Sequence, residues 1–365
     1  MAGTYPGNLG GTFVSDVASL TRLATSGDFA AYVSQAIFEQ SAFVRSGVLT
    51  TLPVLSSTVG TRVEVPFWTP PDPTEEVITS SDDWGTGGAG ALTPQKMEAA
   101  TQYASLTHRG FAYAQDDLSR LATGEDPLGA LRNYLATAIN KKTTAQVVSQ
   151  LEGLFTTALA ANVKDASVTT GEDAPNFMSA SLVSEAKSLL GERGDSLNVM
   201  AMHSKVAYPL EALGMLTFST DSLVAGGNIQ WGGGGVGVSS TRIANFAGLT
   251  VIVDDQMPVV GGAGESEQFV CYLMGRASLA TGDQVPLKIE MGRSLLSLQD
   301  LMTVHYHRTF HIEGTTWTAS TDNPTNAELL TDTNWDLAYT GANAAKLIPA
   351  VRLVVNSSYG GTIPV

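Results

Sequence analysis

The sequence predicts an α+β protein, in which long antiparallel strands and one very long helix precede a compact α/β unit. Three observations carry this prediction. A helical pattern of apolar residues continues from Asp126 to about Ala161, apolar and polar residues alternate in several segments, and short helices and strands follow one another between about residues 176 and 282. At roughly 100–200 residues per domain, a chain of 365 residues accommodates two or three structural units.

The composition limits the classes of function. The chain has 20 basic and 35 acidic residues and a formal net charge of −15, which argues against a protein that grips phosphate backbones over its whole surface but leaves room for a locally basic face. Only 15% of the residues are charged, against roughly 25% in an average soluble domain, while 43% are hydrophobic. We therefore expect some apolar surface to contact other chains.

The sequence shows no export or membrane signal. No basic residue precedes Arg22, and no stretch approaches about 18 uninterrupted apolar residues. The single cysteine, Cys271, lies in the apolar run 269–274 and is expected to be a buried thiol. We expect a protein made and kept in a reducing cytoplasm, without a membrane span.

The first segment is expected to be an extended arm. About the first 25 residues are rich in Gly, Ser and Thr with scattered hydrophobes, a composition that resists packing alone but can lie along another subunit. Asp28 then offers an N-cap, and apolar residues recur at helical spacing to about Ser46. This pattern predicts one amphipathic helix.

A long hairpin is predicted next. Residues 63–67 alternate, and a second alternating run covers residues 97–105. Pro-rich and Gly-rich sequences between them exclude a regular tip, and a loop this long is usually functional or mobile. The tip has no Lys or Arg between Arg62 and Lys96, and its acidic residues are Asp72, Glu75, Glu76, Asp82 and Asp83. Such a charge run is typical either of a solvated face or of docking on a basic neighbour.

The strongest local signal opens the long helix. Asp126 is an N-cap and Pro127 a favoured first-turn residue, and only Gly153 interrupts the pattern before about Ala161. Roughly 34 residues at 1.5 Å each give a rod of about 51 Å. The apolar residues thin out around residues 141–144, which disfavours a continuous coiled-coil seam and favours a spine across a flat domain.

The compact unit is expected to alternate helices and strands. Its predicted elements are a helix over 180–190 that stops at Gly191, a strand over 197–202, a helix from about Ser204, and strands over 249–253 and 267–274. A long two-faced strand follows at residues 304–312.

Three histidines on that last strand, His305, His307 and His311, raise the question of a zinc site. Alternate side chains on a strand stand about 6.7 Å apart, so the first two can share an ion, whereas His311 would lie about 20 Å from His305. We therefore expect a polar sheet face rather than a metal site.

Three further motifs are interpreted as turns or loops. Asp254-Asp255 closes a strand, the run 232–237 lacks the Lys-Ser/Thr of a phosphate loop, and Arg193-Gly194-Asp195 follows a helix stop. We find no Cys/His pair, Gly-x-Ser-x-Gly elbow or nucleotide fingerprint. The sequence thus predicts no catalytic, cofactor or metal site, and its parts suit a protein that reaches across neighbours.

Several short motifs also occur in a characteristic order along nearly the whole chain. They are 108–112 with 116–118, 124–128, 202–204, 248–255, 323–325, 334–335 and 346–348. Together they make the chain similar to the major capsid proteins of tailed bacteriophages, whose fold is named after phage Hong Kong 97. The resemblance implies a fixed order of parts: an N-terminal arm and helix (1–55), an extended hairpin loop (56–110), a peripheral domain with its spine helix (111–175), an axial domain (176–282), returning peripheral strands (283–320) and a C-terminal segment (321–365).

The resemblance implies a shell protein. Hexamers and pentamers of the chain would tile an icosahedral head around packaged double-stranded DNA, without sequence-specific binding, and scaffold, portal and decoration proteins would be its further partners. The chain begins without a long helical pro-domain, so we expect any scaffold to be a separate protein or already removed. The virion capsid is the expected location, after assembly in the cytoplasm of the bacterial host.

In family terms the hairpin would lie over an adjacent subunit. We expect Glu75, Glu76, Asp82 and Asp83 to face basic residues there, with Arg132, Lys141 and Lys142 on the spine helix as first candidates. Some family members join subunits through a Lys–Asn isopeptide bond, for which Lys96 and Asn356 supply the residue types. An encapsulin-like cargo compartment is the alternative with the same fold, and a metal-dependent hydrolase built on His305 and His307 is an alternative of another class.

Overall fold

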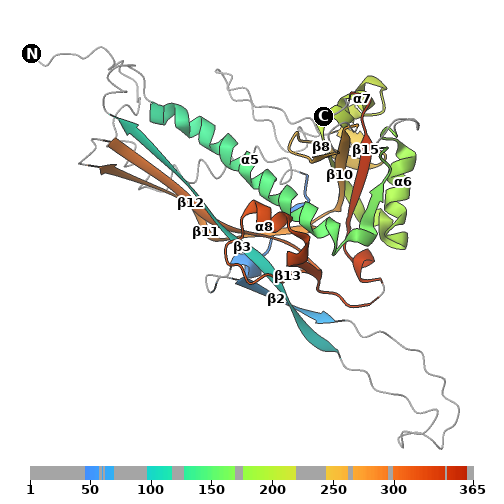
Figure 1. The fold of residues 1–365 in the computed structure, drawn as a ribbon, viewed down its shortest axis with the longest axis horizontal. Coiled ribbons are helices and arrows are strands. Elements are labelled where there is room, and N and C mark those ends of the chain that lie inside the picture. The colour runs from blue at the N-terminus through green and yellow to red at the C-terminus, as the bar shows by residue number, and fades with distance from the viewer. Residues whose placement is uncertain are drawn as a thin grey trace, which may run out of the picture.

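A computed structural model describes residues 46–56, 60, 62–69, 97–116, 127–168, 176–218, 244–261, 266–294, 299–341 and 343–359. They form a long five-stranded sheet with one helix along it and an eight-stranded sheet beside the far end of that helix (Figure 1). The expected arm, the helix beginning at Asp28 and the acidic tip of the hairpin lie outside the described residues.

The five-stranded sheet has the order β1-β11-β12-β3-β2, antiparallel except for the β1–β11 pair. Its strands are β1 (Leu49–Thr51), β2 (Arg62–Thr69), β3 (Glu98–Asp116), β11 (Leu279–Ser294) and β12 (Gln299–Ile312). β2 pairs with the first part of β3, which confirms the predicted hairpin arms. β3 then continues past Ser105 and pairs with β12, so the hairpin and the sheet share one strand.

The predicted long helix is α5 (Pro127–Thr156), which lies along one face of this sheet (Figure 1). Its side chains Leu135 and Ile139 pack in one buried cluster with apolar residues of β11 and β12, including Val304 and Tyr306. The helix ends before the predicted Ala161, because the Leu159 amide donates to the Leu154 carbonyl at 2.8 Å and closes the last turn. The chain then passes through the 3-10 turn η3 (Ala160–Asn162).

Gly153 interrupts the helical pattern near the end of α5, and the structure shows why a glycine stands there. A Cβ at this position would lie 2.2 Å from the Leu329 carbonyl oxygen and 2.9 Å from Trp335 Nε1. Helix α8 (Asn326–Leu330) therefore packs directly against the backbone of α5. Glycine costs a helix about 0.5–1 kcal/mol relative to alanine, and here the close approach explains its use.

The eight-stranded sheet has the order β4-β15-β10-β5-β8-β7-β6, with β9 paired to β10. Its elements are β4 (Val163–Asp165), β5 (Leu197–Met202), β6 (Thr217–Phe218), β7 (Ala244–Phe246), β8 (Leu249–Val253), β9 (Val259–Val260), β10 (Gln268–Gly275) and β15 (Ala350–Asn356). Helices α6 (Ala180–Ser188) and α7 (Ser204–Ala212) accompany it and confirm the predicted alternation of helices and strands.

Two strands of this sheet come from outside residues 176–282. β15 lies between β4 and β10 and pairs antiparallel with β10 over its whole length. Six of its seven residues are buried, and Arg352 is the half-buried exception, as expected of a mainly apolar strand covered on both faces. Every residue of β10 is buried, and this burial raises the pKa of Cys271 to about 12, which confirms the expected buried thiol.

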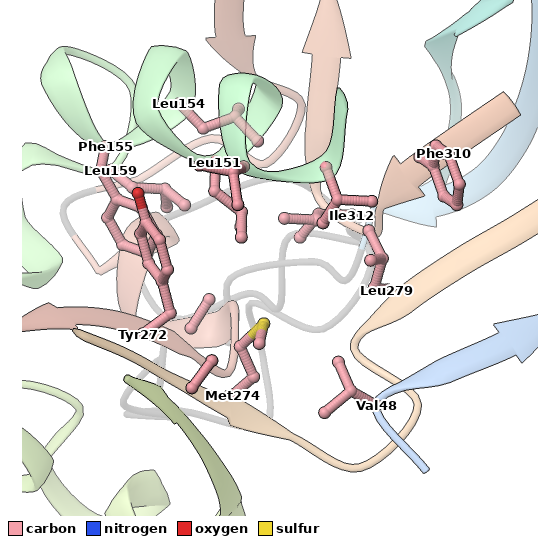
Figure 2. Close-up of a cluster of buried hydrophobic side chains, with 14 of the residues drawn as sticks. Val48, Leu151, Leu154, Phe155, Leu159, Tyr272, Met274, Leu279, Phe310 and Ile312 are labelled. Carbon is pink, nitrogen blue, oxygen red and sulfur yellow. The ribbon is translucent and has the colours of Figure 1, made fainter. Parts of the chain in front are cut away.

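One apolar cluster joins the two sheets through the end of α5. Leu151 and Phe155 of the helix lie toward Tyr272 and Met274 of β10 on one side (Figure 2), and Leu154 belongs to the same cluster. On the other side the cluster continues through Phe310 and Ile312 of β12 (Figure 2). The subunit therefore has a continuous interior from one sheet to the other.

The remaining elements are short and complete this body. They are η1 (Pro53–Ser56), η4 (Gly191–Ser196), β13 (Thr315–Trp317), η6 (Asp332–Asn334), β14 (Trp335–Leu337) and η7 (Ala344–Leu347). None of the described helices is both long enough and apolar enough to span a membrane.

Candidate assembly surfaces

Other elements of the chain cover the two faces of the five-stranded sheet to different extents. On the face that α5 covers, Met302, Val304 and Tyr306 are buried. The opposite side, which we call the open face, has exposed or half-buried side chains along three strands. Its residues are His108, Gly110, Ala112 and Ala114 of β3, Lys288, Glu290 and Gly292 of β11, and Leu301, Thr303, His305 and His307 of β12.

The open face ends where η1 lies over the sheet. Leu55 of η1 is fully buried, and a Cβ at Gly282 would lie 2.5 Å from its side chain. Thr309 and His311, which follow the open face along β12, are buried there. Both ring nitrogens of His311 lack a hydrogen-bond partner among the described residues, and burial lowers its pKa to about 4.

The histidines of β12 therefore separate into two environments. His311 is interior, whereas His305 and His307 are half-buried on the open face with ring centroids 6.4 Å apart. The described residues contain no group of three or more His, Cys, Asp or Glu side chains placed to hold a metal ion. The polar sheet face expected from the alternation is confirmed for His305 and His307. The expectation is wrong for His311, which is buried opposite Ala280, a residue that packs in one cluster with Leu55 of η1.

A third histidine joins the open face from another strand. His108 of β3 stands opposite His307 in the strand register, and the two rings stack with centroids 3.8 Å apart and an interplanar angle of 19°. Burial lowers the pKa of His307, and the neighbouring charges of His108, His305 and Lys288 lower it further. The alternation in the sequence places His305 and His307 on one strand but does not connect His108 or Lys288 with them, because that proximity depends on the register of three strands.

The basic residues expected to receive the acidic hairpin lie on the covered side of the sheet. Lys141 and Lys142 are exposed on α5. Arg132 belongs to the same helix, and its side chain lies outside the described part of the chain. Burial raises the pKa of Asp254, while the positive charge of Lys141 acts in the opposite direction, so this lysine already has an acidic neighbour in its own chain.

The proposed acidic partners Glu75, Glu76, Asp82 and Asp83 lie outside the described residues, as does Lys96. Asn356, the other half of the suggested isopeptide bond, is buried. Its Oδ1 accepts from the Val168 amide at 2.8 Å, and its Nδ2 donates to the Val168 carbonyl at 3.1 Å. These contacts within the chain argue against a covalent bond from Asn356 to a neighbouring subunit.

The other motifs have structural roles. Asp254 accepts from the Gln256 amide in the turn after β8, and Asp255 accepts from the Ser204 amide at the start of α7, which confirms the turn interpretation. Gly194 lies buried in η4, where a Cβ would meet the Lys187 carbonyl oxygen at 2.7 Å. The run 232–237 lies outside the described residues.

A partly buried ion pair fixes α5 to the eight-stranded sheet. Arg352 of β15 donates to Glu152 of α5 at 3.2 Å, and each side chain is 17% exposed. The hydroxyl of Tyr272 on β10 donates to the same carboxylate. Burial and the neighbouring Glu152 raise the pKa of this tyrosine well above its usual value, so it remains a neutral donor.

Two large exposed apolar side chains lie where the β2–β3 hairpin leaves the sheet. Trp68 is 66% exposed, and Met97, just before β3, is 58% exposed. On the other side of the same ribbon Val63 is buried and Phe67 packs edge-on against Tyr339. One side of the ribbon is thus packed on its own chain and the other offers an aromatic side chain to a partner.

Known proteins share both the sequence and the fold. Residues 85–345 match the family described as "Major capsid protein 13-like" (Gp13-like). The chain is 27% identical over 320 residues to the major capsid protein of Bacillus phage SPP1, covering 85% of this chain and 91% of that protein. The solved capsid of Ralstonia phage GP4 has a TM-score of 0.57 at 11% identity, covering 88% of this chain and 92% of its own. The capsid of Cyanophage Pam1 has a TM-score of 0.51 at 10% identity, covering 86% and 89%. These structures confirm the expected Hong Kong 97-type α+β fold.

Proposed function

The chain belongs to the Gp13-like family of major capsid proteins, and from this membership we propose that its copies assemble as hexamers and pentamers into a closed shell around double-stranded DNA. It is a structural component of the virion of a tailed phage, not an enzyme. The alternatives of a metal-dependent hydrolase and of a cargo compartment are set aside, because the relatives are phage capsid proteins.

The observation that carries the proposed assembly is the β2–β3 ribbon. Its exposed side places Trp68 and Met97 beyond the body of the subunit, where no described residue of the chain covers them. A buried tryptophan is among the strongest anchors of protein interfaces. A shell also joins each subunit to several others at once, so that contacts that are weak individually hold it together.

The charge of the chain supports a shell that encloses DNA without adhering to it. With a net charge of −15, the subunit as a whole repels a phosphate backbone, and short-range apolar burial between subunits supplies the cohesion. Scaffold, portal and decoration proteins are proposed as further partners, and the cytoplasm of the bacterial host as the place of assembly.

The domain division is part of the same proposal. The eight-stranded sheet would form the axial domain around the symmetry axis of each capsomer, and the five-stranded sheet with α5 the peripheral domain. Glu75, Glu76, Asp82 and Asp83 would contact a neighbouring copy. The spine-helix acceptors Arg132, Lys141 and Lys142 stay a prediction, and a double-mutant cycle without coupling between the two groups would contradict it.

Electron microscopy and light scattering on the purified protein test the assembly. We expect uniform shells or capsomer rings, and nucleic acid within shells recovered from infected cells. A strict monomer that persists when the scaffold protein of the same phage is supplied would contradict the proposal.

A further inference from the structure

The open face offers a second, chemically different acceptor for the acidic hairpin. Its charged or titratable side chains are Lys288 and Glu290 of β11, His305 and His307 of β12, and His108 of β3. One lysine and one glutamate balance each other when the histidines are neutral. Protonation of the histidines makes this face positive.

The geometry shows a cluster in which three histidines and one lysine share the open face with Glu290, the one acidic side chain among the described residues of that face. His108 and His307 are stacked, and His305 and Lys288 stand directly opposite each other in the strand register. The Nε2 atom of His108 is buried and has no hydrogen-bond partner in the described part of the chain. A carboxylate placed over this cluster would accept hydrogen bonds from the half-buried imidazoles of His305 and His307 and compensate the charge of Lys288.

We propose that the acidic segment 72–83 of one subunit, through Glu75 and Glu76, docks on the histidine cluster of the open face of a second copy. This segment combines five carboxylates with no basic residue, so its charge complements a protonated imidazole cluster. The inference rests on the proposed assembly into a shell, and it names an alternative to the spine-helix lysines, on the opposite face of the sheet.

The length of the chain favours a second copy over the segment's own subunit. Thr69 pairs with Glu98 in the last pair of the β2–β3 ladder, so the chain toward the acidic segment leaves the ladder beside Glu98. Residues 70–76 span at most about 25 Å when fully extended. From Glu98 to His108, β3 covers about 34 Å. Only a fully extended segment that runs straight back along β3 would bring Glu75 and Glu76 near the histidines of their own chain, which favours a second copy.

The chemistry makes this contact dependent on pH. Carboxylates with ordinary pKa values are ionised above about pH 4.5, and a histidine in ordinary surroundings is protonated below about pH 6.5. Burial and the neighbouring charges lower the pKa of His307, so the attraction grows as the pH falls toward the lower of these values. Lys288 contributes at every pH in this range, while Glu290 opposes the contact. A docked carboxylate in turn favours the protonated histidines.

Cysteine crosslinking on particles recovered from producing cells tests the contact. The native chain has one cysteine, Cys271, which is fully buried, so background disulfide formation is low. Particles are assembled from two chains, one carrying Glu76→Cys and the other His305→Cys, and are oxidised at pH 6. A disulfide in this mixture can join only different subunits. The matched control replaces His305→Cys with Lys142→Cys, an exposed position on α5.

We expect several-fold more crosslinked dimer from the Glu76→Cys and His305→Cys pair than from the control pair, and only in assembled particles. More product from the Lys142→Cys pair, or no product from either pair in intact particles, would overturn the docking proposal while leaving shell assembly intact. Failure of the unmodified chain to assemble would overturn the proposed function as well.

A second measurement needs no cysteine. The fraction of wild-type particles that dissociates in a fixed concentration of denaturant should be several-fold greater at pH 8 than at pH 6. His305→Gln combined with His307→Gln should abolish most of this difference, and Glu290→Gln, which removes the opposing charge, should reduce dissociation at both pH values. An unchanged pH profile in the double histidine variant would contradict the proposal.

Discussion

The eight-stranded sheet and the five-stranded sheet of this subunit differ in how far their own chain covers them. β10 and β15 at the centre of the first sheet are buried almost throughout. The second sheet is buried beneath α5 and η1, while Ala112, Ala114 and Thr303 on its open face are exposed. The eight-stranded sheet is therefore stabilised by burial within its own chain. The five-stranded sheet leaves one face open, which a neighbouring subunit can cover.

The largest expected effect comes from a substitution in the core of the eight-stranded sheet. Leu353→Ala removes a fully buried side chain from β15 and should lower the free energy of unfolding by about 2–5 kcal/mol. Leu301→Ala is the matched change on the open face, where the side chain is 39% exposed, and should stay within about 0.5 kcal/mol. Denaturant titration of the unassembled subunit measures both. Equal losses would contradict the distinction between the sheets.

A pH experiment sharpens the comparison within one strand. The folded pKa of His311, about 4, is depressed by burial from the ordinary value of 6.5, so the unfolded chain binds this proton first as the pH falls. The resulting stability is complete above pH 6.5 and is lost toward pH 4, a change of about 3 kcal/mol.

Denaturant titrations between pH 7 and pH 4 on the wild type and His311→Gln measure this contribution. The variant should lose less stability over the interval, because the carboxylates that also titrate there are common to both proteins. Parallel pH profiles would show that His311 is not buried as a neutral ring.

A smaller effect is expected where α5 meets α8. Gly153→Ala forces a Cβ toward the Leu329 carbonyl oxygen and should cost about 1–3 kcal/mol, even though alanine favours helices. Gly292→Ala is the control on the open face, where no atom lies within 4 Å of the added carbon. Thermal unfolding compares them, and a stabilised Gly153→Ala would refute the close packing.

The smallest expected effect concerns the link between the two sheets. Glu152→Gln leaves Arg352 without its anion in a partly buried site and should cost about 1–2 kcal/mol. Glu185→Gln breaks the Lys164–Glu185 pair, in which the glutamate is 53% exposed, and should cost less than about 1 kcal/mol. Denaturant titration distinguishes these values, and equal small losses would mean that the buried pair contributes orientation rather than stability.

The sequence predicted individual helices and strands better than it predicted which strands pair with one another. The start of α5, the hairpin arms and the alternating helices and strands of the compact unit follow from local patterns, caps and stops. The place of β15 beside β10 did not follow, because the pairing of strands far apart in the sequence depends on packing rather than on local pattern.

The same reason applies to the candidate surfaces. His305 and His307 were recognised as one face of a strand. The stacking of His108 on His307 and the burial of His311 depend on the strand register and on which segments lie over the sheet, and neither can be derived from the alternating pattern. The alternating pattern of the sequence signals which residues share a face. It contains no information about which segment lies over that face.

The position of β15 also governs the order in which the subunit can fold. β10 leaves the ribosome before β11, β12 and α8, and its partner β15 follows all of them. During that interval one edge of β10 has exposed backbone donors and acceptors, which other nascent chains can pair with. Closure of the eight-stranded sheet is a late, long-range step and therefore intrinsically slow. Cells that make this protein in quantity should accumulate incomplete subunits when synthesis outpaces that step.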